Sequence, residues 1–168
     1  GFKFSPDGTK VILVKSIAYN DIIQPKHKDL PKASGMVIND LNYRHWDHYV
    51  TSNAHPFVAD VVKTPTDGKD EPVINEGKDI LEGEPYECPM APFGGIEQLN
   101  WSPDSKTIAY TCRKKTGRDY AISTDSDIYL YDIATGNTKN LCKSAGFQQP
   151  EVDATKTMAT QDINSERY

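Results

Sequence analysis

The chain has 168 residues, of which 37% are hydrophobic and 26% charged, and its formal net charge at pH 7 is −5. This is the composition of an ordinary globular protein, and a negative chain without a basic stripe does not favour a nucleic-acid partner. No apolar run approaches the roughly 18 residues that span a bilayer, and no charged region followed by an apolar stretch opens the chain, so we expect no membrane span.

The first predicted unit begins with the turn motif Ser-Pro-Asp-Gly at residues 5–8. Proline presets φ for the second turn position, serine and aspartate bond the local backbone, and glycine tolerates the last position. The apolar run Val11 to Val14 follows as a strand, and Phe57 to Val61 is the next strand. Residues 15–56 between them are predicted to be a long inserted loop, and loops of this length are usually functional or mobile.

A patch from Leu41 to Tyr49 inside this insertion is dense in aromatic, histidine and charged residues. One interpretation is a substrate or partner surface, because Tyr43, Arg44 and Trp46 are residue types that anchor interfaces and bind carboxylates. Another is a structural insertion in which Trp46 packs on the sheet and Arg44 pairs with Asp40 or Asp47. The sequence leaves both open.

Histidines give the same patch a third interpretation, a metal site. The candidate ligands are His45, His48 and Asp47, with His55 nearby. No cysteine and no His-x-x-x-His helix frames them, so the spacing does not favour a metal, and we expect no metal or cofactor.

Residues 62–79 are predicted to be a polar surface excursion before a last strand near Asp79 to Leu81. The stretch from Gly83 to Gly95 holds three prolines and a Gly-Gly pair, which is typical of a link between structural units. Its surroundings carry carboxylates suited to a cationic group, although exposed glutamates are usually only solvated: Glu82, Glu84, Glu87 and Glu97.

A second unit repeats the first. Ser-Pro-Asp-Ser at residues 102–105 precedes a strand at Thr107 to Arg113, whose residues Ile108, Tyr110 and Cys112 share one face. A loop at 114–126 leads to a strand at Ile128 to Ile133, and Ala-Thr-Gly-Asn at 134–137 closes a hairpin to 138–142. Weak alternation in the 128–133 strand predicts that both of its faces are covered.

Units of roughly 40 to 50 residues made of several strands are typical of β-propeller blades. We therefore predict an all-β fold, a partial β-propeller of about two four-stranded antiparallel blades plus the start of a degenerate third near Val152. The predicted divisions are a first blade at 1–82, a Pro/Gly-rich link at 83–98, a second blade at 99–143 and the third unit at 144–168. A closed propeller needs about four to eight blades, so we expect a segment of a longer protein whose open edges self-associate.

The remaining motifs of the chain do not indicate a catalytic or metal-binding site. Cys88, Cys112 and Cys142 have no Cys-x-x-Cys spacing and are expected to be small buried residues. The stretch 123–127 resembles a calcium loop only loosely, and an Asx-type turn explains it better. No Gly-x-Ser-x-Gly motif, phosphate loop or dinucleotide fingerprint occurs, so we expect no catalytic residues in this chain.

Six stretches of the chain form a recognisable set: Phe4 to Gly8, Tyr43 to Asp47, Phe57 to Val61, Gly83 to Met90, Pro92 to Glu97 and Trp101 to Asp132. Together they resemble the N-terminal propeller of bacterial dipeptidyl aminopeptidases of the prolyl oligopeptidase family, which are dipeptidyl peptidase IV-like serine peptidases. The resemblance extends over roughly Phe2 to Cys142, and the tail from Gln148 departs from it.

The resemblance implies a parent exopeptidase that removes dipeptides from peptide substrates and whose C-terminal α/β-hydrolase domain carries Ser, Asp and His. It implies that the propeller caps this active site, and that Arg44, Asp47 and Glu97 are gating or substrate-facing groups. It also implies a periplasmic or secreted location. The alternatives are a non-catalytic periplasmic TolB-like propeller that acts as a protein-interaction module and, less favoured, a propeller-type polysaccharide lyase.

Overall fold

The structure is a computed structural model that describes residues 1–19, 27–35, 38, 40–41, 49–66 and 69–143. Nine strands and two short helices make up the described part of the chain. They are β1 (Phe2–Phe4), β2 (Lys10–Ala18), β3 (Ser52–Thr66), β4 (Lys69–Ile74), β5 (Lys78–Asp79), the 3-10 helix η1 (Ile96–Gln98), β6 (Leu99–Trp101), β7 (Thr107–Cys112), α2 (Gly117–Ile122), β8 (Asp127–Asp132) and β9 (Thr138–Asn140).

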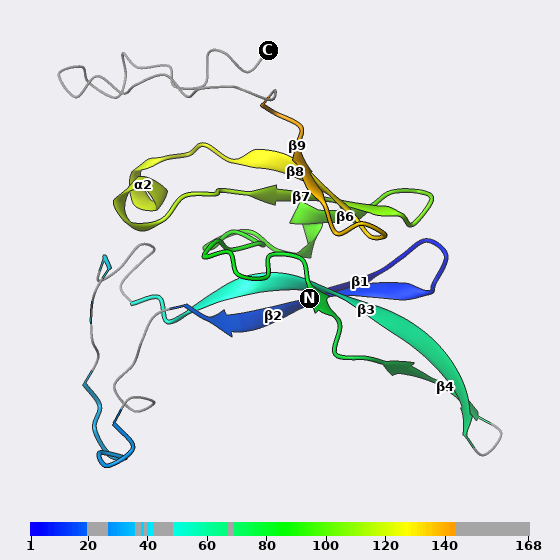
Figure 1. Cartoon of the computed structure of the whole chain (residues 1–168), viewed down its shortest axis with the longest axis horizontal. Coiled ribbons are helices and arrows are strands. Elements are labelled where there is room, and N and C mark those ends of the chain that lie inside the picture. Colours follow the sequence, from blue (N-terminus) through cyan, green and yellow to red (C-terminus); the bar gives the residue numbers. More distant parts are fainter. Residues whose placement is uncertain (20–26, 36–37, 39, 42–48, 67–68, 144–168) are drawn as a thin grey trace.

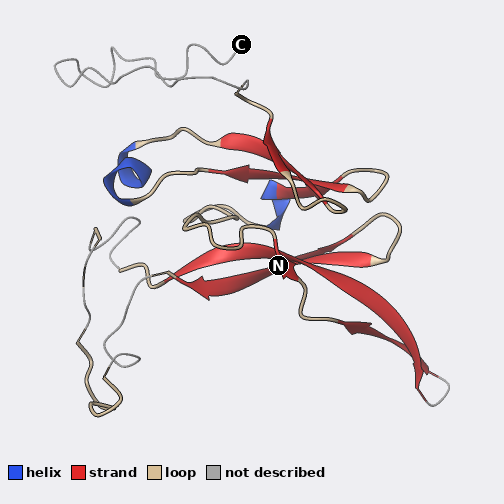
Figure 2. Ribbon diagram, viewed as in Figure 1, coloured by secondary structure: helices blue, strands red, loops and turns tan. Residues whose placement is uncertain are grey.

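These strands form two antiparallel sheets that lie one above the other (Figure 2). The first has the order β1-β2-β3-β4, with β5 pairing on β3, and the second has the order β6-β7-β8-β9. The predicted all-β fold is confirmed, and the two stacked sheets are consistent with a partial β-propeller. The predicted third unit at 144–168 lies outside the described residues.

The two sheets share one register, as the sequence repeat predicted. Val11 is paired with Ala59 in the first sheet, as Ile108 is paired with Tyr131 in the second. The outer strands follow the same rule, because β5 and β9 take equivalent places on β3 and β8. The blade-like units are therefore β1-β2-β3-β5 and β6-β7-β8-β9.

The turns at residues 5–8 and 102–105 have matching hydrogen bonds and backbone conformations. The N–H of Lys10 donates to Ser5 Oγ at 2.9 Å, and the N–H of Thr107 donates to Ser102 Oγ at 3.0 Å. In the last turn position Gly8 has φ 70° and Ser105 has φ 61°. The second turn therefore places a serine in the left-handed region that glycine occupies in the first.

The ends of the inserted segment are strand rather than loop. Strand β2 continues to Ala18 and β3 begins at Ser52, with Ala18 and Ser52 paired, so both ends of the range 15–56 belong to the sheet. The boundary was placed too early because Lys15 and Ser16 interrupt the apolar pattern, although strand residues need no apolar side chain where they face solvent.

The predicted loop at 114–126 contains the helix α2, which is a correction. Tyr120 is its one buried residue, at 1% exposure. A six-residue helix spans too few turns to show an apolar period, so its signal was absent from the sequence.

The polar excursion after Val61 is a β-hairpin. Strand β4 pairs with the far half of β3, and this arm extends away from the two stacked sheets (Figure 1). Val62 and Val73 face each other across the arm and are 52% and 54% exposed. Charged residues and prolines in this stretch hid the strand pattern in the sequence.

The core lies between the sheets. The face of β7 with Ile108, Tyr110 and Cys112 is buried there, as predicted, together with Leu99 and Ile12. The opposite face of β8 is not covered by the described residues, since Ile128 is 45% exposed. The unit predicted to cover it, residues 144–168, lies outside the described residues, so the expectation of two covered faces stays a prediction.

Candidate functional site

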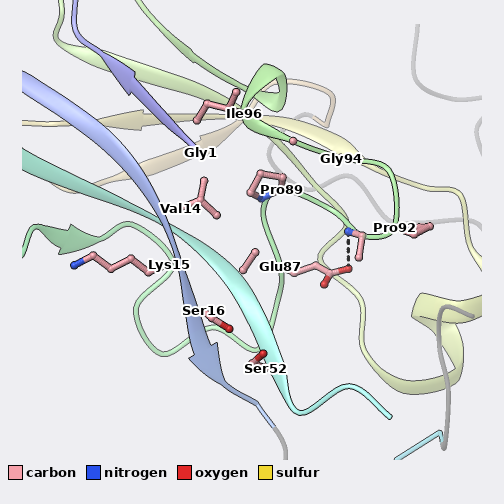
Figure 3. A pocket seen from close by; sticks show the side chains of 13 residues that line it. Gly1, Val14, Lys15, Ser16, Ser52, Glu87, Pro89, Pro92, Gly94 and Ile96 are labelled. Atoms are coloured by element: carbon pink, nitrogen blue, oxygen red, sulfur yellow. Dashed lines mark hydrogen bonds between the residues drawn. The ribbon is translucent and has the colours of Figure 1, made fainter. Parts of the chain in front are cut away.

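Two cavities flank the link between the sheets, near the end of β2 and the start of β3. The larger has a volume of about 510 Å³ (Figure 3). Its lining residues are Gly1, Val14, Lys15, Ser16, Ser52, Ala54, Glu87, Pro89, Ala91, Pro92, Gly94, Gly95 and Ile96.

Glu87 supplies the acidic group of this larger cavity. The residue is only 5% exposed, and its Oε1 accepts a hydrogen bond from the N–H of Ala91 at 3.1 Å (Figure 3). The same oxygen accepts a hydrogen bond from the hydroxyl of Tyr120. These bonds fix a buried carboxylate in a mixed wall that also holds apolar groups such as Val14 and Pro89 and the polar side chains of Lys15, Ser16 and Ser52. A wall of this kind suits an apolar group that carries a hydrogen-bond donor or a positive charge.

The smaller cavity, of about 300 Å³, contains a histidine–carboxylate pair. Nδ1 of His55 lies 2.8 Å from Asp79 Oδ2, and Asp79 Oδ1 accepts the N–H of Leu81 at 2.9 Å. His55 is 3% exposed, so this pair fixes the orientation of a buried ring. Within the described ranges no group of three or more His, Cys, Asp or Glu residues is arranged to hold a metal ion.

Glu84 lies at the border of the smaller cavity and is paired with Lys114. Lys114 Nζ is 2.6 Å from Glu84 Oε2 and lies over the rings of Tyr129 and Tyr86, at 4.8 Å and 5.7 Å from their centres. One ammonium group is therefore held by a carboxylate and two aromatic faces.

The predicted site residues fall in different places. Glu97 is exposed on η1, where its Oε1 accepts the N–H of Gly95 at 2.7 Å, and Gly95 lines the larger cavity. Arg44 and Asp47 lie outside the described residues. Asp40 was predicted as a possible partner of Arg44. Its carboxylate accepts a hydrogen bond of 3.2 Å from the hydroxyl of Tyr19.

The sequence did not predict that His55 pairs with Asp79 or that Lys114 pairs with Glu84. His55 and Asp79 are 24 positions apart, and Lys114 and Glu84 are 30 apart. Pairs at such separations show no local spacing. The one usable signal was the repeat, which places Asp79 on the outer strand beside β3.

The cysteine prediction is confirmed for two of three residues. Cys88 and Cys112 are fully buried, and burial raises the pKa of the Cys112 thiol to about 12. Burial also raises the pKa of Cys88. Both thiols are therefore protonated and unreactive at neutral pH. Cys142 is only half-buried.

The acidic stretch at 123–127 is a turn with paired carboxylates. The N–H of Asp125 donates to Ser123 Oγ at 3.0 Å, as expected for a local turn. Lys143 Nζ lies 2.7 Å from Asp127 and 3.3 Å from Asp125. A lysine therefore supplies the positive charge beside these carboxylates.

Comparison with known proteins identifies relatives that share a name. No protein-family model matches the chain. A protein named dipeptidyl-peptidase 5 from Porphyromonas gingivalis is 49% identical over 84% of this chain, and another from Porphyromonas endodontalis is 44% identical over the same share. A dipeptidyl-peptidase 5 from Arthroderma otae is 28% identical over 66% of this chain.

The chain spans 19% of the length of the two Porphyromonas relatives. None of the helices in the described ranges is long and apolar enough to cross a membrane. The resemblance to dipeptidyl aminopeptidases is confirmed at the level of the sequence. The chain is thus a homologue of a segment of the bacterial dipeptidyl-peptidase 5 proteins.

Proposed function

We propose that this chain is a non-catalytic propeller segment of a serine-type dipeptidyl peptidase of the prolyl oligopeptidase family. In this role it caps an α/β-hydrolase domain and controls how the amino terminus of a peptide reaches the active site. The observation that carries the proposal is the 49% identity to a dipeptidyl-peptidase 5. The shared register of the two sheets supports the propeller part of it.

The geometry of the link supports the gating role. Both cavities border the link. Glu87 lines the larger one, whereas the acidic groups of the smaller one are paired, Asp79 with His55 and Glu84 with Lys114. A carboxylate at such a position favours a charged amino terminus and so determines which peptide bond meets a nucleophile.

The activity test compares the full-length protein with the 168-residue chain on dipeptidyl 4-nitroanilide substrates. We expect hydrolysis by the full-length protein only, and inhibition by a serine-directed phosphonate. Hydrolysis by the 168-residue chain contradicts the assignment of chemistry to another domain. A full-length protein that hydrolyses nothing but binds a protein partner supports the TolB-like alternative.

The gating role also predicts a kinetic effect of Arg44, Asp47 and Glu97. In the full-length protein, we expect Arg44→Ala, Asp47→Ala and Glu97→Gln to raise KM severalfold and to leave kcat unchanged, because they remove contacts that are equally strong in the ground state and in the transition state. Glu82→Gln, an exposed glutamate before the link, is the matched control. Unchanged KM in all three variants removes these residues from the proposal.

A periplasmic or secreted location is part of the same proposal. An enzyme that breaks down peptides outside the cytoplasm must lie in the same compartment as those peptides. Fractionation of cells that produce the full-length protein tests this, and recovery with the cytoplasmic fraction contradicts it.

A further inference from the structure

Arg113, the residue that follows β7, has a guanidinium group that pairs with no carboxylate in the described part of the chain. Its Nη1 donates a 3.0 Å hydrogen bond to the carbonyl of Tyr120, and the group lies over the Tyr120 ring, 4.7 Å from the ring centre. Its Nε is buried and has no hydrogen-bond partner within the described ranges. The tyrosine therefore holds the guanidinium group in place and leaves its positive charge without a counter-charge.

The two lysines that follow Arg113 differ from it in this respect. Lys114 Nζ lies 2.6 Å from Glu84, and Lys115 Nζ lies 3.6 Å from Asp125, so each of these charges has a partner. A charged N–H group that is removed from water without an acceptor costs free energy, and a carboxylate oxygen is a strong acceptor for it. Because one positive charge lacks a partner, the position suits a carboxylate with one negative charge better than a phosphate group with nearly two.

The sequence repeat relates Arg113 to a residue that lines a cavity. Counted from the first residues of the paired strands, Lys10 and Thr107, Arg113 is the repeat equivalent of Ser16. Ser16 lines the cavity of about 510 Å³ beside the link. Arg113 therefore occupies, in the second unit, the position from which the first unit contributes to a ligand-sized cavity.

Hydroxyl groups share the face of the second sheet on which Arg113 lies. Thr111 and Ser126 are the repeat equivalents of Val14 and Ala54, which line the cavity of the first unit. A hydroxyl group donates a hydrogen bond to an anion, which an alkyl side chain cannot do. The second unit thus combines a cation with hydroxyl donors at a place where the first unit has two alkyl groups.

We propose that Arg113, with the hydroxyl groups of Thr111 and Ser126, binds the carboxylate group of a peptide ligand. A chain terminus and an acidic side chain both supply a carboxylate, and a guanidinium group recognises this shared chemistry. The proposal concerns binding and does not depend on peptidase activity.

The first test follows the reaction of arginine side chains with phenylglyoxal in the unmodified full-length protein, by mass spectrometry of its proteolytic fragments. We expect N-acetylalanine, N-acetylglutamic acid α-amide or both to slow the reaction at Arg113 at least about threefold, because a bound carboxylate covers the guanidinium group. The exposed Arg118 is the control site, and N-acetylalanine amide, which has no carboxylate, is the control ligand.

The ligand that protects Arg113 at the lower concentration identifies the source of the carboxylate, a chain terminus or a side chain. An unchanged rate at Arg113 with both carboxylates overturns the proposal. A lack of reaction at Arg113 in the absence of any ligand also overturns it, because the guanidinium group is then covered by the protein itself.

The second test measures calorimetric binding of the better of these two ligands to variants of the full-length protein. Arg113→Gln keeps a hydrogen-bond donor for the Tyr120 carbonyl but has no charge, so we expect at least about tenfold weaker binding. Arg118→Gln removes the same charge from an exposed position and should bind like the unmodified protein. Equal affinities of Arg113→Gln and the unmodified protein overturn the proposal.

Discussion

The backbone N–H of Asp7 donates a 3.1 Å hydrogen bond to Ser105 Oγ, which joins the turn of the first sheet to the turn of the second. Ser105 is the repeat equivalent of Gly8, and both have positive φ. A second contact of the same kind lies nearby, where Trp101 Nε1 donates to the carbonyl of Lys3 at 3.0 Å. The two units are therefore joined by polar contacts between equivalent parts as well as by their shared core.

Ser105 gives the first stability prediction. Ser105→Ala loses the bond from Asp7 and keeps a side chain at positive φ, so we expect a loss of about 1 kcal/mol in the free energy of unfolding. Ser105→Gly loses the same bond but relieves the backbone, so it should be close to neutral. Urea unfolding of the two variants measures the difference, and equal losses contradict this account.

Gly8 is the matched position in the first turn. It has φ 70° and open space where a Cβ would lie, so Gly8→Ala tests backbone conformation without a clash. We expect a loss of about 1 kcal/mol from the left-handed conformation alone. An unchanged unfolding midpoint would mean that the turn relaxes to another conformation.

The carboxyl group of Asp7 predicts that the stability of the fold depends on pH. Hydrogen bonds from the Ser5 hydroxyl, then from the N–H of Thr9, lower the pKa of Asp7 below its usual 3.8. A carboxyl group whose pKa is lower in the folded state stabilises the fold above pH 3.8, and this contribution is lost as the pH falls through the lowered pKa. Ser5→Ala should move the NMR-measured pKa of Asp7 back toward its usual value. If the pKa of Asp7 does not change in this variant, groups other than Ser5 lower it.

Two substitutions of Asp79, which pairs with His55, are expected to destabilise the fold to different extents. Asp79→Asn keeps an acceptor oxygen for the N–H of Leu81, and its amide N–H can donate to Nδ1 of the neutral His55 ring, so we expect only a small change in unfolding free energy. Asp79→Ala leaves a buried ring nitrogen and a backbone N–H without acceptors, which costs about 1 to 3 kcal/mol. Thermal unfolding compares the two, and equal stability of both variants would show that the pair contributes little.

Much of the sheet structure was predictable from the repeat. The turn motifs with the strands that follow them, and the buried face with Ile108 and Tyr110, are local signals, because turn chemistry and side-chain alternation act within a few residues. The helix α2 and the arm β4 were not predictable. Each gains its structure from a partner strand or a single buried tyrosine and not from its own pattern.

The candidate site was less predictable than the fold. Glu84 and Glu87 were noted only as members of an acidic link, and their partners Lys114 and Tyr120 come from the second unit. Such convergence depends on how the sheets stack, which sequence spacing does not encode. Glu97 was singled out, yet its carboxylate bonds to the neighbouring Gly95.

The uncovered face of the second sheet gives the last prediction. Pro56 is fully buried between the sheets, whereas its repeat equivalent Ile128 is 45% exposed. If a third unit stacks on this face in the full-length protein, Ile128→Asp should cost about 2 to 4 kcal/mol there and less than about 0.5 kcal/mol in the 168-residue chain. In that shorter chain the same apolar face and the open strand edges should cause self-association, which light scattering measures and Ile128→Asp should reduce. A monomer at high concentration contradicts the self-association of the shorter chain, and equal losses of stability in both proteins contradict the stacking of a third unit.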